Sequence, residues 1–249
     1  MNSNPIITLF GKAGSGKSTV ASLIRANVPN TNIIAFSDPI KELGFSLFGF
    51  SDDQLHGPSE RRNVIDERYN FRAMWDKVKQ IAPGLSLDWL EKYNIQLKEP
   101  EPDFGDYDAE SQIFMKWLND LEVKTIGSHV GLSPRIFLQS LGTEYGRRLD
   151  KSLWVNIAFS RADELLANGS NLVVISDGRF RTEIVEGRGQ FVLIDKPIVS
   201  QSFSGHISET ELDGIPHYWF DTVLKNDGDL TSLENKVKVL CNSFEPEIL

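Results

Sequence analysis

Residues 11–19 read GKAGSGKST, and this stretch constrains the fold more than any other part of the chain. It follows an apolar, β-prone run at residues 5–10 (PIITLF), and residues 17–27 after it carry apolar side chains at helical spacing. A glycine-rich turn between a buried strand and a helix is typical of loops that bind phosphate through backbone N–H groups. We therefore expect the chain to begin with the strand–loop–helix unit of a nucleotide-binding α/β fold.

The loop itself matches the phosphate-binding pattern G-x-x-x-x-G-K-[ST]. Lys17 is expected to contact the β- and γ-phosphates of a nucleoside triphosphate, with ATP as the expected donor, and the Ser18 hydroxyl to bind Mg²⁺. Loops of this kind serve kinases, motors and switches alike, so the pattern predicts a ligand and leaves the reaction open. The predicted ATP-binding residues of the loop are Gly11, Lys12, Ala13, Gly14, Ser15, Gly16, Lys17, Ser18 and Thr19.

Strand-like segments recur along the chain and alternate with helical ones. The expected strands span residues 5–10, 32–36, 171–176, 190–195 and 221–225. Strands separated by helices pair in parallel through right-handed crossovers. The sequence therefore predicts an α/β fold with a central parallel five-stranded sheet flanked by helices.

Capping signals place two of the helix starts. Asp38 followed by Pro39 is expected to begin a helix, because proline suits the first helical position. Near the end of the chain, Thr231 and Glu234 form a T-x-x-E pattern. This pattern predicts a capping box and a last helix that begins at Thr231.

Residues 50–130 break the alternation of strands and helices. They contain aromatic helical fragments and an acidic, turn-rich stretch at residues 99–110. We expect a single domain over residues 1–249, with a core formed by residues 1–49 and 131–249. The intervening residues are expected to form a mostly helical insertion, or lobe.

A polar helix face is predicted after Ser133, which precedes a proline in a helix-start pattern. On this helix Phe137, Leu141 and Tyr145 would form one apolar stripe. The alternative for the other face is an ordinary exposed surface whose glycine packs against a neighbour. That other face would present a guanidinium, an amide, a glycine and a hydroxyl, which suit a phosphate and a base: Arg135, Gln139, Gly142 and Thr143.

A third polar group, SDGRFRTE, directly follows the strand expected at residues 171–176. Ligands of parallel α/β sheets lie at the carboxyl ends of the strands. Asp177 could organise Mg²⁺ through water or accept a hydrogen bond from a substrate hydroxyl, and Arg179 could neutralise phosphate. Arg179 and Glu183 would share one helix face. The alternative interpretation is a capping aspartate with an i,i+4 salt bridge.

Composition excludes several classes of function. The formal charge of −9, from 26 basic and 35 acidic residues, argues against a nucleic-acid polymer as partner. One cysteine, Cys241, and four scattered histidines provide neither a disulfide framework nor the spacing of a zinc site. No run of about 18 apolar residues indicates a membrane span. We expect a soluble cytoplasmic protein.

Six stretches together resemble the bacteriophage deoxynucleoside monophosphate kinases, members of the P-loop nucleoside monophosphate kinase superfamily. In the family's order they are GKAGSGKST, SDPIKE, SPRIFLQSLGTEYGRRLDKSLWV, VVISDGRFRTE, SGHISETEL and VLKNDGDLTSLENKV. The R-x-x-x-Q-x-x-G-T helix with its downstream tryptophan, and the D-x-R-x-x-x-E pattern, are the most specific parts. The insertion at residues 50–130 matches poorly.

The resemblance implies that the chain transfers the γ-phosphoryl group of ATP to a deoxynucleoside 5′-monophosphate (dNMP) with Mg²⁺, giving dNDP and ADP, with broad base specificity. It also implies a single domain with the three-layer P-loop kinase-like fold, in which residues 50–130 form an acceptor-side lobe. Trp154 would stack on the base, unless it simply packs in the core. Asn226, after the last strand, would lie along the adenine, unless it forms a plain turn. A homodimer is suggested by the family alone. The implied catalytic residues are Lys17, Arg135, Asp177 and Arg179, and the acceptor pocket would comprise Arg135, Gln139, Gly142, Thr143, Trp154, Asp177, Arg179 and Glu183.

Two other functions remain open from the residues alone. Another small-molecule P-loop kinase, such as one acting on dephospho-coenzyme A, would share the loop and the core. A nucleotide-dependent switch would share the loop but form no ADP in response to an acceptor.

A nucleoside monophosphate kinase also needs a lid that excludes water from the phosphates. The loop at residues 196–216 and the insertion are the candidates for this lid.

Overall fold

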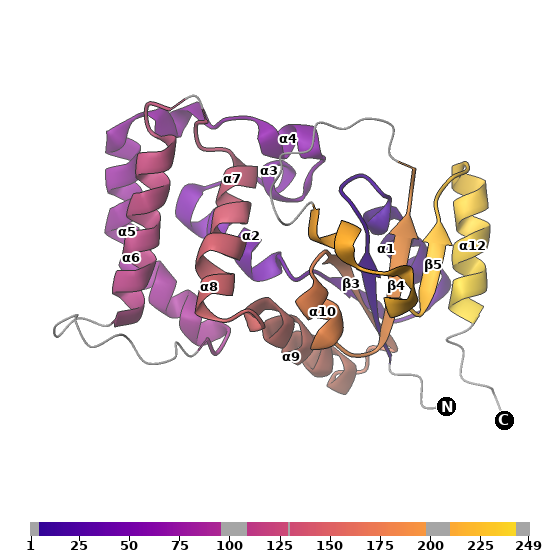
Figure 1. The fold of residues 1–249 in the computed structure, drawn as a ribbon. Coiled ribbons are helices and arrows are strands. Elements are labelled where there is room, and N and C mark those ends of the chain that lie inside the picture. Colours follow the sequence, from indigo (N-terminus) through magenta and orange to yellow (C-terminus); the bar gives the residue numbers. More distant parts are fainter. Residues whose placement is uncertain (1–4, 96–108, 129, 198–209, 243–249) are drawn as a thin grey trace. The chain divides into compact units, whose positions relative to one another are not determined.

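The computed structural model describes residues 5–95, 109–128, 130–197 and 210–242 (Figure 1). Most of the acidic stretch at residues 99–110 and of the lid candidate at 196–216 lies outside these residues. The chain folds into two compact units, one formed by residues 1–36 and 154–249 and the other by residues 37–153.

A parallel sheet organises the first unit (Figure 1). Its strands, in the spatial order β2-β3-β1-β4-β5, confirm the predicted parallel five-stranded sheet. The central strand β1 leads into the phosphate loop and pairs with β3 and β4 on its two sides. The strand bounds are β1 (Ile6–Phe10), β2 (Thr31–Ile34), β3 (Leu172–Gly178), β4 (Gln190–Asp195) and β5 (Thr222–Lys225).

The two faces of this sheet are covered by different elements. Leu9 and Phe10 point to opposite faces, because side chains alternate along a strand. Leu9 belongs to a buried cluster with Ile24 of α1 and Val237 of α12, whereas Phe10 packs with Ile184 of α10. The elements are α1 (Lys17–Asn27), α9 (Leu153–Ala167), α10 (Arg181–Val185), the 3₁₀ turns η3 (Glu211–Gly214) and η4 (His217–Trp219), and α12 (Leu230–Asn242).

The predicted start of the last helix was wrong by one residue. Helix α12 begins at Leu230, and the Oδ1 atom of Asp229 accepts a hydrogen bond from the N–H of Ser232 at 2.8 Å. Asp229 is therefore the N-cap in place of Thr231, since an aspartate that precedes the first turn is a strong capping residue. The helix predicted from Asp38 and Pro39 begins where expected.

The second unit is helical and contains the predicted lobe at residues 50–130 (Figure 1). Its core is aromatic: the Phe48 ring lies 5.1 Å from Tyr69, 5.6 Å from Trp75 and 5.1 Å from Phe137, between centroids. Its elements are α2 (Asp38–Phe48), α3 (Asp52–His56), α4 (Ser59–Asn63), η1 (Glu67–Asn70), α5 (Arg72–Lys92), α6 (Ala109–Thr125), α7 (Pro134–Gln139), the π-helical segment η2 (Ser140–Gly146) and α8 (Arg147–Leu149).

The Asp66–Arg68 ion pair makes the stability of the second unit pH-dependent. The Oδ2 atom of Asp66, which is 7% exposed, lies 2.6 Å from Nη2 of Arg68. The hydrogen bond from Arg68 lowers the pKa of Asp66 below its ordinary 3.8. A lowered carboxyl pKa stabilises the fold above the unfolded-state pKa, and this contribution is lost as the pH falls through the folded-state value.

We expect Asp66→Asn to lower the free energy of unfolding at pH 7 by about 1 kcal/mol, because Arg68 is half exposed and solvent screens the pair. The difference between variant and wild type should shrink below about pH 4. Urea unfolding at pH 7 and pH 3 measures both values. A difference that stays constant across this range would contradict the assignment.

Among the helices that the structure describes, none is both long and apolar enough to cross a membrane.

Candidate active site

The phosphate loop curls between β1 and α1. Gly11 has a φ of 153°, and a Cβ there would lie 2.5 Å from Ser15 Oγ and 2.9 Å from the carbonyl oxygen of Ile194. Any larger residue would clash at this point, so the glycine is required by close packing of the loop against β4. The loop ends at Lys17, where α1 begins and its unpaired backbone N–H groups add partial positive charge.

Lys17 lies inside this loop. Its side chain is buried, and Nζ donates to the carbonyl oxygens of Gly11 and, at 2.9 Å, of Lys12. Ser18 and Thr19 are exposed on the first turn of α1. The arrangement places an ammonium group, backbone amides and two hydroxyls at one helix end, which is a set of groups that can bind a polyphosphate.

Ser18 is also suited to coordinate Mg²⁺, because its hydroxyl oxygen is a hard ligand and Mg²⁺ prefers oxygen ligands. In the described ranges no group of three or more His, Cys, Asp or Glu side chains could hold a metal ion. This donor set suits a metal that arrives with substrate phosphates and takes one or two protein ligands.

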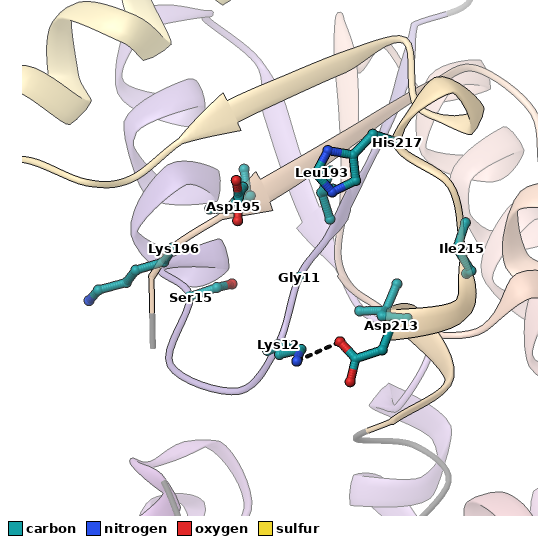
Figure 2. Close-up of a pocket in the computed structure, with 11 residues that line it drawn as sticks. Gly11, Lys12, Ser15, Leu193, Asp195, Lys196, Asp213, Ile215 and His217 are labelled. Atoms are coloured by element: carbon teal, nitrogen blue, oxygen red, sulfur yellow. Dashed lines mark ion pairs between the residues drawn. The ribbon is translucent and has the colours of Figure 1, made fainter. Parts of the chain in front are cut away.

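A cavity of about 420 Å³ lies beside the loop in the first unit (Figure 2). It is lined by the loop, the end of β4 and the segment at residues 212–217. Figure 2 shows Lys12 of the loop paired with Asp213, at 2.5 Å. The buried Oγ of Ser15 also lines the cavity and has no hydrogen-bond partner among the residues that the structure describes. Polar groups therefore face this space from three elements.

Several residues that line this cavity were not predicted from the sequence. Asp195 stands at the carboxyl end of β4, so the rule that identified Asp177 after its strand would also have identified Asp195. No local sequence pattern predicts that Asp213 and His217 line this cavity, because only the tertiary structure brings them to the phosphate loop.

The acidic residues near the end of β3 bind backbone amides. Oδ1 of Asp177 accepts a hydrogen bond from the N–H of Phe36 at 2.7 Å, at the end of the neighbouring strand. Oε2 of Glu183 accepts from the N–H groups of Arg179 and Phe180 at 2.6 and 2.9 Å. Glu183 thus caps the start of α10, whereas Asp177 ties the end of β3 to Phe36, two residues after β2. The predicted roles of both carboxylates toward Mg²⁺ or a substrate stay predictions.

The predicted polar face on residues 135–143 crosses a change of helix type. Ser133 caps α7 as expected, and its Oγ accepts from the N–H of Ile136 at 3.3 Å. The helix then becomes π-helical over η2, in which each N–H bonds the carbonyl five residues earlier. The face was predicted with uniform α-helical spacing, so its geometry beyond Gln139 was wrong. The apolar stripe holds, since Phe137, Leu141 and Tyr145 are all buried.

Two polar side chains of α7, Arg135 and Gln139, differ in their hydrogen bonding within the second unit. Nε of Arg135 donates to Oδ1 of Asn63, at the end of α4. The nearby N–H of Asp66 donates to the carbonyl oxygen of Leu132 at 2.7 Å, so the predicted lobe is tied to the start of α7. Nε2 of Gln139 is buried and has no hydrogen-bond partner within the described part of the chain. Asn63 is a further residue that the sequence analysis did not identify.

Gly142 and Trp154 of the predicted acceptor pocket are both buried. Gly142 is buried, and a Cβ there would lie 3.1 Å from Cδ1 of Ile40, so close packing against Ile40 favours a small residue at this position. Thr143 is half-buried in η2, and Trp154 at the start of α9 is 5% exposed. The structure therefore gives Gly142 and Trp154 packing roles, while their predicted contacts with a ligand stay predictions.

Comparison with known proteins decides which family this site belongs to. Residues 5–237 match the family model described as deoxynucleotide monophosphate kinase. The chain belongs to this family. Its members' activity makes it a phosphotransferase with a phosphate group as acceptor, which confirms the resemblance noted from the motifs.

Two relatives are similar to this deoxynucleotide monophosphate kinase family member over most of its length. A protein of Acanthamoeba polyphaga mimivirus, provisionally assigned as a deoxynucleotide monophosphate kinase, is 27% identical over 237 residues, which are 93% of each chain. The deoxynucleoside-5′-monophosphate kinase of Escherichia phage T5 is 31% identical over 192 residues, which cover 72% of this chain and 69% of the phage protein.

Proposed function

We propose that this chain transfers the γ-phosphoryl group of ATP to dNMP, giving dNDP and ADP, and accepts more than one base. The phosphate loop carries the proposal: its curled backbone surrounds the Lys17 ammonium group at the start of α1. The name of the phage T5 relative, a deoxynucleoside-5′-monophosphate kinase, supports dNMP as the acceptor class.

The proposed reaction needs no strong general base, because the acceptor phosphate is already an anion. One of its oxygens forms a bond to the γ-phosphorus while the bond from that phosphorus to the β,γ-bridging oxygen breaks, and ADP leaves. Catalysis then consists of aligning two phosphates and neutralising the charge that spreads over the transferred group. Mg²⁺, bound with ATP, supplies positive charge to the phosphates; Ser18 would bind it directly and Asp177 through water.

The proposed roles divide between donor and acceptor. Lys17 neutralises charge on the donor phosphates, and Arg135 and Arg179 do so on the acceptor side. The loop residues Gly11 to Thr19 and Asn226 are the proposed ATP-binding residues. The proposed acceptor-binding residues are Arg135, Gln139, Gly142, Thr143, Trp154, Asp177, Arg179 and Glu183.

Three further points rest on the resemblance and on the chemistry. A closing lid would keep water from the phosphates, and the loop at residues 196–216 and the lobe at residues 50–130 are the proposed moving parts. Activity is proposed for the cytoplasm, that of the host if the chain is phage-encoded. A homodimer stays a prediction.

An ADP-release assay with Mg-ATP and each of dAMP, dGMP, dCMP and dTMP tests the function and its base specificity together. We expect acceptor-dependent ADP formation with several of the four and much less with the ribose counterparts. ADP formation that no nucleoside monophosphate stimulates would contradict the proposal. Stimulation by dephospho-coenzyme A alone would instead assign the chain a different acceptor.

A further inference from the structure

Asn226 connects the last strand of the sheet to the phosphate loop. It directly follows β5, and its backbone N–H donates to the carbonyl oxygen of Asp195 at the end of β4, at 2.7 Å. Its side-chain Nδ2 donates to the carbonyl oxygen of Ser15 at 2.8 Å. The backbone of Asn226 is thus held by the sheet, and its side-chain amide is held by the loop. The second contact joins residues that are 211 positions apart in the sequence.

This contact decides how one peptide of the loop is oriented. The peptide group between Ser15 and Gly16 is planar and trans, so its carbonyl and its N–H point in opposite directions. When the carbonyl oxygen of Ser15 is bound by Asn226 on one side, the N–H of Gly16 must point to the other. In a phosphate loop the backbone N–H groups are the phosphate donors.

Gly16 shows that the contact shapes the loop. Its φ of 100° lies in the region that favours glycine, and a Cβ there would lie 2.6 Å from Nδ2 of Asn226. The glycine of the phosphate-binding pattern and the asparagine after β5 therefore fit together: the absence of a side chain at residue 16 leaves room for the amide.

We propose that Asn226 is a positioning residue, which holds the Ser15–Gly16 peptide so that its N–H faces a bound phosphate. This role is distinct from the adenine contact that the sequence suggested, which stays a prediction. It rests on the proposed function only in that the loop binds the triphosphate donor. A group that acts on the loop affects every polyphosphate ligand equally, whereas a group that contacts the base does not.

Binding of Mg-ATP, Mg-GTP and inorganic tripolyphosphate to Asn226→Ala separates these two roles. We expect all three affinities to fall about tenfold, because one loop peptide is released and one charge-assisted hydrogen bond to phosphate weakens. Asn226→Asp keeps the shape but has no donor, so it should lose at least as much. Asn226→Gln keeps the amide and should recover part of the affinity.

The matched control is Asn171→Ala, which removes a similar amide-to-carbonyl hydrogen bond, to Pro29 at 3.0 Å, away from the loop. It should leave all three affinities unchanged. A loss limited to Mg-ATP, or no loss of tripolyphosphate affinity in the Asp variant, would overturn the proposal. Because these measurements contain no acceptor, they are independent of whether dNMP is the substrate.

Discussion

Lys17→Ala is expected to lower kcat about a thousandfold or more with every acceptor, because it removes the positive charge closest to the transferred phosphoryl group. The Lys17 ammonium group lies within the curl of the phosphate loop, on the carbonyl oxygens of Gly11 and Lys12. Initial rates of ADP formation at saturating ATP and dNMP measure the effect.

Arg25→Ala is the control for this variant, since Arg25 is an exposed residue in the last turn of the same helix. It should keep wild-type activity, and both variants should unfold near the wild-type temperature. Turnover by Lys17→Ala within about tenfold of wild type would contradict the assignment of the phosphate loop as the donor site.

Arg135→Ala should lower kcat/KM for dNMP about a hundredfold while the Kd for Mg-ATP changes by less than about twofold. Its guanidinium group is oriented by Asn63 in the second unit, whereas the phosphate loop belongs to the first unit. Loss of an acceptor-side cation therefore should not disturb the donor site. Steady-state kinetics with varied dNMP, combined with calorimetric ATP binding, measures both quantities.

Arg148→Ala serves as the comparison, because Arg148 is an exposed arginine of α8, in the same helical stretch of the chain. It should leave kcat/KM for dNMP within about twofold of wild type. Collapse of ATP binding in Arg135→Ala with normal ATP binding in Arg148→Ala would show that Arg135 acts on the donor instead.

The strand–loop–helix unit at the start of the chain could be predicted because its signals are local. The apolar run before Gly11, the glycines of the loop and the spacing of apolar residues after Lys17 lie within about twenty residues of each other. The parallel sheet followed from the same kind of signal, because buried parallel strands are continuous apolar runs separated by helices. The fold was therefore accessible from the sequence without any long-range contact.

The polar face on residues 135–143 was harder to predict, because the helix type changes at Ser140. A π-helical segment has no signal in residue spacing, since packing of the surrounding side chains selects it. At Gly142 the structure shows close packing against Ile40, and the predicted approach of a ligand at this glycine stays a prediction. The roles of Gln139 and Thr143 toward an acceptor stay predictions.

Side chains that bind backbone groups far away in sequence could not be assigned from spacing alone. The i,i+4 relation of Arg179 and Glu183 gave no indication that Glu183 also binds the backbone N–H groups of residues 179 and 180. The contacts of Asn226 with Ser15 and of Asp213 with Lys12 depend on the order of strands in the sheet and on the segment at residues 212–217. Such contacts become visible only when the fold is known.

The most direct test of the account follows the phosphoryl group itself. ATP labelled at the γ-phosphorus is incubated with the enzyme, Mg²⁺ and dGMP or dTMP, and the products are separated by anion-exchange chromatography. The account predicts that the label moves into dNDP in a one-to-one ratio with the ADP formed. Label recovered as inorganic phosphate at the same rate with and without dNMP would show that the chain hydrolyses ATP without transferring its phosphoryl group, and would contradict the kinase assignment.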